Sequence, residues 1–204
     1  MRVRIDPERP APRKLAPAVD ALRRDQVILY PTDTGYAFGC ALSSRKGITA
    51  VRTLKGYDER SRKPLSMLVN ALSDFGHYAI MDTNVFRTVR RILPGAYTII
   101  LEASTEVPRD MRNRFGEIGL RMPDAPVCRM LVEALGEPIV TGSLTSGDDE
   151  PELEDPDELE RLYAGRVEVV VDGGVMWPEP STILQAADGG LEVTREGKGP
   201  VPGD

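Results

Sequence analysis

Apolar residues recur along the chain in two patterns: short runs typical of buried strands, and helical spacing typical of amphipathic helices. The short runs predict strands in residues 27–30, 64–69, 97–102, 117–121, 138–143, 167–174, 181–185 and 191–195. The helical spacing predicts helices in residues 15–24, 44–54, 84–93, 125–135 and 157–163. Some strands alternate with helices and others follow one another directly. We therefore expect a mixed α/β sheet rather than a doubly wound parallel one.

Capping and breaking residues mark the ends of several predicted elements. Ser44 is a candidate N-cap for the second helix, and Gly136 follows the fourth. Pro31 directly follows the first apolar run, so we expect that strand to end there. No linker or internal repeat interrupts the pattern, and we expect one domain over residues 1–204.

The composition is that of an ordinary globular protein, with 41% hydrophobic and 28% charged residues. No stretch approaches eighteen apolar residues, and the N-terminal segment lacks the apolar core of a secretory signal. Two cysteines and one histidine argue against a disulfide framework and a multi-histidine metal site. We therefore expect a soluble, reduced, cytoplasmic protein with no membrane partner and no structural metal.

The net charge of −6 hides an uneven distribution. Residues 148–160 carry nine acidic residues and no basic one, so the rest of the chain has a net charge of +3. A solvated loop and helix start is the usual meaning of such a run, and the alternatives are shielding of a basic groove and docking of a basic partner. The basic clusters elsewhere suit an anionic ligand such as a nucleotide or RNA, although each alone is typical of a solvated surface.

Familiar catalytic motifs are missing from the sequence. It holds no phosphate-binding GxxxxGK[ST] loop, no GxGxxG dinucleotide fingerprint and no GxSxG nucleophile turn. A serine–histidine–aspartate site would have to use His77, the single histidine, and a structural role is the simpler interpretation of that residue.

Hydroxyl and basic side chains gather instead where predicted strands end. Thr32 and Thr34 follow the first strand, and Ser143 lies at the end of another. Such positions bind ligands in open α/β sheets, but the hydroxyls serve equally well to cap a turn. Lys55 near a helix end and Arg121 at a strand end supply cations suited to phosphates or carboxylates. A lysine at a helix C-terminus is also a common stabilising device.

Nine short motifs in fixed order resemble the YrdC/YciO family, and most closely its YciO branch. They are YPTDTGYAFGC (30–40), LK (54–55), KPLSMLV (63–69), PGAYTIIL (94–101), IGLRMP (118–123), GEPIVTGSL (136–144), VDGG (171–174), PSTI (180–183) and TREG (194–197). The resemblance covers essentially the whole chain. It implies a YrdC/RibB-like twisted mixed open sheet with flanking helices and a concave basic surface.

The resemblance also implies an activity. Members of the family make L-threonylcarbamoyladenylate from threonine, bicarbonate and ATP, which feeds the threonylcarbamoyladenosine modification of tRNA, and relatives bind double-stranded RNA or tRNA. ATP with Mg²⁺ is the implied substrate pair. Residue by residue, the motifs imply contacts to threonine from Thr32, Thr34 and Ser181. They imply contacts to the nucleotide from Lys55, Arg121, Ser143, Thr145 and Arg195. No residue is assigned as a general acid or base.

Two family signatures are altered in this sequence. The K-x-R signature is Lys55-Gly56-Tyr57 here, and the S-x-N signature is Ser143-Leu144-Thr145. Arg60 and Arg62 in the following loop are candidate replacements for the missing arginine. The alterations leave three functions open: nucleotidyl transfer of the synthase type, hydrolysis of the same adenylate, and RNA binding without catalysis. The oligomeric state stays open as well.

Overall fold

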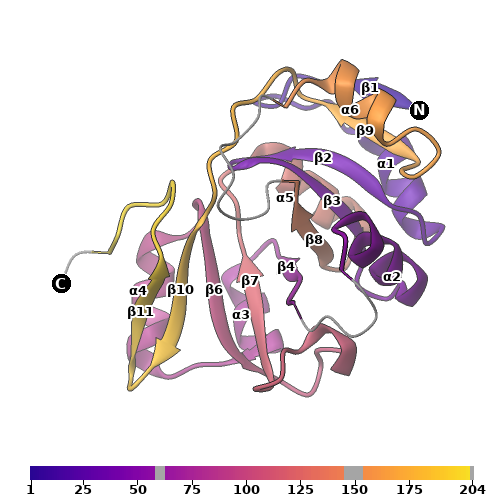
Figure 1. Cartoon of the computed structure of the whole chain (residues 1–204). Helices are drawn as coiled ribbons and strands as arrows, with labels where there is room; N and C mark the ends of the chain where they lie inside the picture. The colour runs from indigo at the N-terminus through magenta and orange to yellow at the C-terminus, as the bar shows by residue number, and fades with distance from the viewer. Residues whose placement is uncertain (58–62, 145–153, 203–204) are drawn as a thin grey trace.

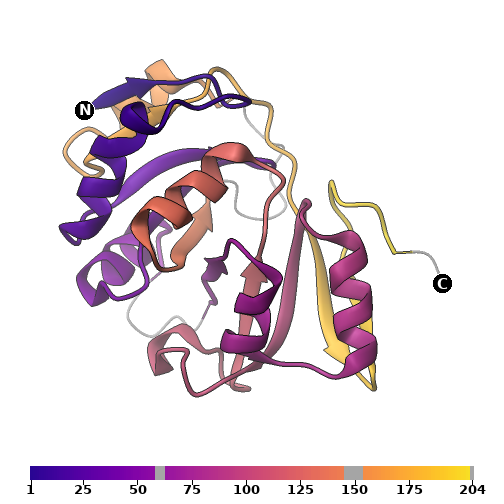
Figure 2. The same cartoon turned by 180° about the vertical axis from the view of Figure 1, so that it is seen from behind.

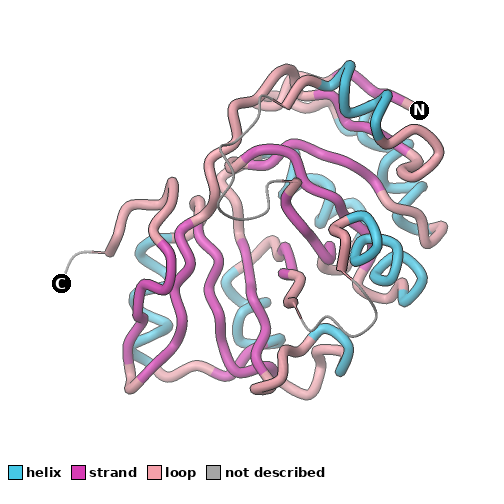
Figure 3. The backbone as a smooth tube through the Cα atoms, in the orientation of Figure 1, coloured by secondary structure: helices cyan, strands magenta, loops and turns pink. Residues whose placement is uncertain are grey.

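The computed structural model describes residues 1–57, 63–144 and 154–202 of the chain. In this part the strands join in one sheet (Figures 1 and 3). The strands are β1 (Arg2–Arg4), β2 (Ile28–Thr32), β3 (Gly35–Ala41), β4 (Ser66–Leu68), β5 (Ala79–Ile80), β6 (Tyr97–Ala103), β7 (Glu117–Arg121), β8 (Ile139–Ser143), β9 (Val169–Asp172), β10 (Thr182–Ala187) and β11 (Gly190–Arg195). The helices are α1 (Pro12–Arg23), α2 (Arg45–Leu54), α3 (Leu72–Tyr78), α4 (Thr83–Ile92), α5 (Pro126–Leu135), α6 (Pro156–Leu162) and the 3₁₀ turn η1 (Arg109–Met111).

The strand order is β1-β9-β2-β3-β8-β4-β7-β6-β10-β11, and β5 pairs with β6 outside this path. The sheet contains parallel pairs such as β4 with β7 and β6 with β10, and antiparallel pairs such as β3 with β8 and β6 with β7. The sheet is therefore mixed and open, as the sequence predicts. In Figure 1 the strands β2 and β3 run across the direction of β6, β7 and β10.

Helices cover the two halves of the sheet separately. Seen from behind, α1 and α5 lie side by side over the half that contains β2 and β9, whereas α3 and α4 lie over the other half (Figure 2). Successive residues of the central strands point to opposite faces. Ile28 belongs to the cluster under α1 and α5, and Leu29 belongs to the larger cluster on the opposite face. Burial on both faces explains why these strands are nearly continuous apolar runs.

The structure confirms several predicted boundaries. The Ser44 side chain accepts a hydrogen bond from the Gly47 N–H at 2.9 Å, as expected of an N-cap. Gly136 ends α5 with a φ of 86°, a left-handed conformation that glycine adopts without strain. Strand β7 has the predicted bounds of 117–121.

Other boundaries were predicted wrongly. Strand β2 continues through Pro31 to Thr32. A proline is tolerated within a strand at a position where the ladder requires no N–H donor. Strand β3, which pairs with β2 as a hairpin, was not predicted. Its sequence GYAFGCA contains two glycines and lacks the β-branched residues that signal a strand.

Among the described residues, no helix is both long enough and apolar enough to cross a lipid bilayer.

Candidate functional site

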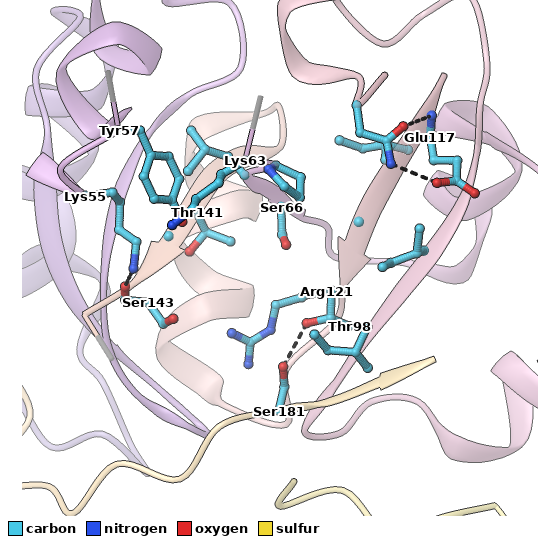
Figure 4. A pocket seen from close by; sticks show the side chains of 18 of the residues that line it. Lys55, Tyr57, Lys63, Ser66, Thr98, Glu117, Arg121, Thr141, Ser143 and Ser181 are labelled. Atoms are coloured by element: carbon cyan, nitrogen blue, oxygen red, sulfur yellow. Dashed lines mark hydrogen bonds between the residues drawn. The ribbon is translucent and has the colours of Figure 1, made fainter. Parts of the chain in front are cut away.

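A cavity of about 400 Å³ opens at the middle of the sheet (Figure 4). Residues from β4, β6, β7, β8, β10 and β11 line it, together with the segments that follow α2 and precede β4. Its volume lies within the range of small-molecule sites. The cavity thus collects segments that are far apart in the sequence.

Strand register builds the floor of the cavity. Thr141 of β8 pairs with Ser66 of β4, Ser66 pairs with Gly119 of β7, and Gly119 pairs with Ile100 of β6. Paired residues lie on one face of a sheet, so these four form a row across four strands. A Cβ atom at Gly119 would approach Ser66 Oγ to 3.0 Å and Thr98 Cγ2 to 3.2 Å, so the glycine keeps the row open at its centre.

Lys55 joins the cavity because α2 ends there. It is the C-cap residue of α2, and its ammonium donates a hydrogen bond to the Ser143 carbonyl at the end of β8. Burial and, to a smaller extent, the neighbouring Lys63 ammonium together lower the pKa of Lys55 to about 8. The site therefore holds a partly buried lysine next to a second cation.

Tyr57 lines the cavity between these two lysines. Its ring centroid lies 6.0 Å from Lys55 Nζ and 5.5 Å from Lys63 Nζ. Both distances are within the range of cation–π attraction. Burial raises the pKa of the Tyr57 hydroxyl, which therefore stays a neutral hydrogen-bond donor.

Arg121 lies at the opposite end of β7 from Glu117 and forms a buried ion pair with Asp33. Arg121 Nη2 is 3.0 Å from Asp33 Oδ1, and the two side chains are 6% and 9% exposed. The same nitrogen donates to Thr34 Oγ1 at 2.8 Å. Arg121 Nε is buried and has no hydrogen-bond partner among the described residues, although the residue lines the cavity. One donor of this guanidinium thus has no hydrogen-bond partner within the described part of the chain.

The β2–β3 turn uses its own hydroxyls. Thr32 Oγ1 donates to the Gly35 carbonyl at 2.7 Å and accepts from the Thr34 N–H at 3.1 Å. Both threonines are buried, and neither is among the cavity-lining residues. In this structure the two hydroxyls therefore stabilise the β2–β3 turn, and Thr34 also contacts Arg121. Capping of a turn is the alternative role that the sequence offers for them.

Asp33 connects this turn to three other segments. Its carboxylate accepts from Arg121 and from the Asp124 N–H at 3.2 Å, and its carbonyl accepts from Lys198 Nζ. Sequence reasoning missed this residue as part of the site. An aspartate in a turn has a common local explanation, and its arginine partner is 88 residues away along the chain.

The β10 side of the cavity contributes Ser181 and Arg195. Ser181 Oγ and Thr98 Oγ1 are 2.8 Å apart, and Arg195 Nη2 donates to the Ser181 carbonyl at 2.7 Å. Burial, followed by the Arg121 charge, lowers the pKa of Arg195. Two arginines therefore line the same cavity close enough for the charge of one to affect the pKa of the other.

The predicted site residues thus fall into three groups. Lys55, Arg121, Ser143, Ser181 and Arg195 line the cavity together. Thr32 and Thr34 belong to the β2–β3 turn, as described above. Thr145, the candidate arginines Arg60 and Arg62, and residues 148–153 of the acidic run lie outside the described residues.

Sequence reasoning also passed over several lining residues. Lys63, Ser66, Thr98, Asn113 and Glu117 line the cavity but were not predicted as site residues. Lys63 stands beside the cations that were noticed, so its signal was present in the sequence. The single histidine, His77, is exposed on α3, stacks edge-on against the Tyr78 ring and does not line the cavity.

The donors that line the cavity suit anions rather than a bare metal ion. Two lysines and two arginines line it, and Glu117 is the only carboxylate among the described lining residues. No group of three histidine, cysteine, aspartate or glutamate side chains in the described part of the chain could hold a metal ion. A divalent cation would fit this site as a phosphate-bound ion, because Mg²⁺ keeps much of its water shell and binds largely through phosphates.

Comparison with known proteins finds a matching family model, related sequences and related structures. Residues 20–197 match the Sua5_yciO_yrdC family model, described as "Telomere recombination". The chain is 32% identical over 198 residues to the uncharacterized protein YciO of Escherichia coli strain K12, covering 97% of this chain and 95% of that protein. The crystal structure of E. coli YciO has a TM-score of 0.90 to this chain at 31% identity, covering 98% and 97% of the two chains.

More distant relatives are named for an activity or have been solved with a bound ligand. A putative threonylcarbamoyl-AMP synthase of Methanocaldococcus jannaschii is 29% identical over 178 residues, covering 86% of this chain and 82% of that protein. The crystal structure of Pyrococcus abyssi Sua5 complexed with L-threonine has a TM-score of 0.85 at 22% identity, covering 97% of this chain and 57% of that one. The second likeness is one of fold alone.

Proposed function

The chain belongs to the Sua5/YciO/YrdC family, and from this premise we propose that it is an L-threonylcarbamoyladenylate synthase-like protein that binds ATP and threonine. Its product would serve the threonylcarbamoyladenosine modification of tRNA. One observation carries the proposal. Five residues that the family motifs assign to these ligands, from five separate segments, line one cavity: Lys55, Arg121, Ser143, Ser181 and Arg195.

The proposed reaction needs positioning and charge neutralisation more than acid–base chemistry. Threonine, bicarbonate and ATP give L-threonylcarbamoyladenylate, pyrophosphate and water. We assign the phosphates to Lys55, Lys63 and Arg195, which line the cavity, because such contacts stabilise charge at a reacting phosphate. Mg²⁺ would arrive with ATP and would neutralise part of the phosphate charge at this site. Arg121 Nε is the donor we assign to the carboxylate of threonine.

Hydrolysis of the adenylate is a second candidate, and the altered signature favours it. Tyr57 lines the cavity where the family signature has an arginine. A neutral phenol cannot supply the permanently charged, two-pronged contact that a guanidinium makes with phosphate. Loss of one such contact to a transition state costs about 10²- to 10³-fold in rate. A site weakened in this way would still bind an adenylate.

The test is a reaction assay with the purified chain. The protein is incubated with ATP, threonine, bicarbonate and Mg²⁺, and pyrophosphate and the adenylate are followed by mass spectrometry. Threonine-dependent adenylate supports the synthase. In a second sample with added adenylate, loss of adenylate that is faster than without the protein and that releases AMP supports the hydrolase. Lys55→Ala should abolish either activity, whereas Lys46→Ala, an exposed lysine on the same helix, should not.

Binding of double-stranded RNA or tRNA without catalysis is the outcome that a negative reaction assay would favour. The cations that line the cavity are the observation in its support, and the net charge of −6 stands against it. A titration with tRNA at increasing salt tests for RNA binding, because contacts to the phosphates make the affinity fall steeply with salt. A flat response would exclude this candidate.

A further inference from the structure

Strand β7 runs along the cavity and carries opposite charges at its two ends; we call this direction the axis of the cavity. Glu117, Gly119 and Arg121 all line the cavity, and alternate residues of a strand lie on one face. The Cα atoms of Glu117 and Arg121 are about 13 Å apart along the extended strand, so the axis has an acidic residue at one end, a basic residue at the other and an open glycine between them. In Figure 4, Glu117 lies across the cavity from Lys55 and Ser143.

The Glu117 carboxylate is held in place by two neutral amides. Asn113 Nδ2 donates to Glu117 Oε2 at 2.8 Å, and Gln185 Nε2 donates to Glu117 Oε1 at 2.9 Å. Asn113 Oδ1 also accepts from the Glu117 N–H at 3.0 Å, so the asparagine contacts both the backbone and the side chain of the glutamate. The carboxylate is therefore fixed in orientation, and no cation in the described part of the chain forms an ion pair with it.

Within residues 1–57, 63–144 and 154–202, this arrangement leaves acceptor positions of the Glu117 carboxylate without donors. A carboxylate has about four lone-pair positions, and the two amides occupy one on each oxygen. A negative charge in a cavity built for phosphates weakens phosphate binding unless the ligand brings donors to it. The remaining acceptors, one on each oxygen, match a pair of neighbouring hydroxyl groups.

The length of the axis decides which ligand brings those donors. In an α-amino acid the ammonium and the carboxylate are attached to the same carbon, so one threonine cannot reach Glu117 and Arg121 together. A nucleotide separates its phosphates from its ribose hydroxyls by several bonds. We propose that Glu117 binds the 2′,3′-diol of the ribose while Lys55, Lys63 and Arg195, assigned above to the phosphates, hold the other part of the nucleotide. This inference rests on the proposed binding of ATP.

The test compares ATP with 2′,3′-dideoxy-ATP by isothermal titration calorimetry. The wild-type protein should bind ATP at least about tenfold more tightly, since a hydrogen bond to a charged group contributes about that factor or more. Glu117→Gln should reduce the preference to less than about twofold and leave the affinity for 2′,3′-dideoxy-ATP unchanged or higher. Gln185→Met, which removes one of the two amides from a half-buried position, should reduce the preference in part.

The matched control is Glu102→Gln. Glu102 pairs with Glu117 across β6 and β7 but is exposed and does not line the cavity, so its loss should preserve the preference. Equal wild-type affinity for the two nucleotides would overturn the inference and leave the proposed function standing. A Glu117→Gln protein that keeps the preference but loses threonine affinity would overturn it in favour of the threonine ammonium. Failure of the wild-type protein to bind either nucleotide would overturn both.

Discussion

Phosphate binding at this site should weaken as the pH rises past the pKa of Lys55. A typical lysine keeps its proton until the pH approaches about 10.4. Burial and the nearby Lys63 lower the pKa of Lys55 to about 8. If the ammonium holds a phosphate, ATP affinity must follow the protonated fraction of the ligand-free protein.

The magnitude follows from that pKa. With a value of about 8, about three quarters of the lysine is protonated at pH 7.5 and about one tenth at pH 9.0. The apparent dissociation constant for ATP should therefore rise about eightfold over this interval, or by about 1.2 kcal/mol. Binding at pH 8.0 should take up about half a proton per ATP, because the bound phosphate restores the ammonium form.

Calorimetry in buffers of different ionisation enthalpy measures both quantities. Lys55→Arg should flatten the pH profile and abolish proton uptake, because arginine stays charged throughout. Lys46→Arg, on the exposed face of α2, should behave as the wild-type protein. A flat wild-type profile without proton uptake would refute the assignment of Lys55 to the phosphates. A direct NMR titration that places the pKa of Lys55 near 10.5 would refute its burial.

Three further predictions concern stability, each measured by urea unfolding of the purified chain. Asp33→Ala should lower the free energy of unfolding by about 3 kcal/mol, because it leaves Arg121 as an unpaired buried charge. Addition of Arg121→Met should recover part of this loss. A loss below about 1 kcal/mol in Asp33→Ala would contradict a buried ion pair. Gly35→Ala should cost at least about 2 kcal/mol, because φ is 117° and the new Cβ would lie 2.7 Å from Pro178 Cβ; near-wild-type stability would show that the turn adapts. Ser44→Ala should cost about 1 kcal/mol by removing the N-cap of α2, with Ser44→Asp as the variant that restores it; no difference between the two variants would count against the cap.

Local sequence signals predicted much of the secondary structure. The apolar run of β7, the N-cap at Ser44 and the glycine after α5 follow from periodicity and from backbone preferences within a few residues. Where the local signal was weak the prediction failed, as in β3 with its two glycines. Pro31 misled it, because a proline breaks a strand only where the ladder needs its N–H.

For the site too, some features follow from the local sequence and others depend on residues far apart along the chain. Ordered motifs in the sequence pointed to Lys55, Arg121 and Arg195, and the structure brings these residues to one cavity. Their charges follow from residue type alone. By themselves, however, they do not say which cation is already paired within the protein and which has a donor left for a ligand.

Only the tertiary structure decided those partnerships. Asp33 meets Arg121 across 88 residues of chain, and Gln185 meets Glu117 across 68. The lowered pKa of Lys55 arises from burial and from a neighbour that folding brings close. Side-chain type and local backbone preference act over a few residues and are written in the sequence. Burial, strand register and the pairing of distant charges depend on which strands lie side by side, and that arrangement exists only once the whole sheet has formed.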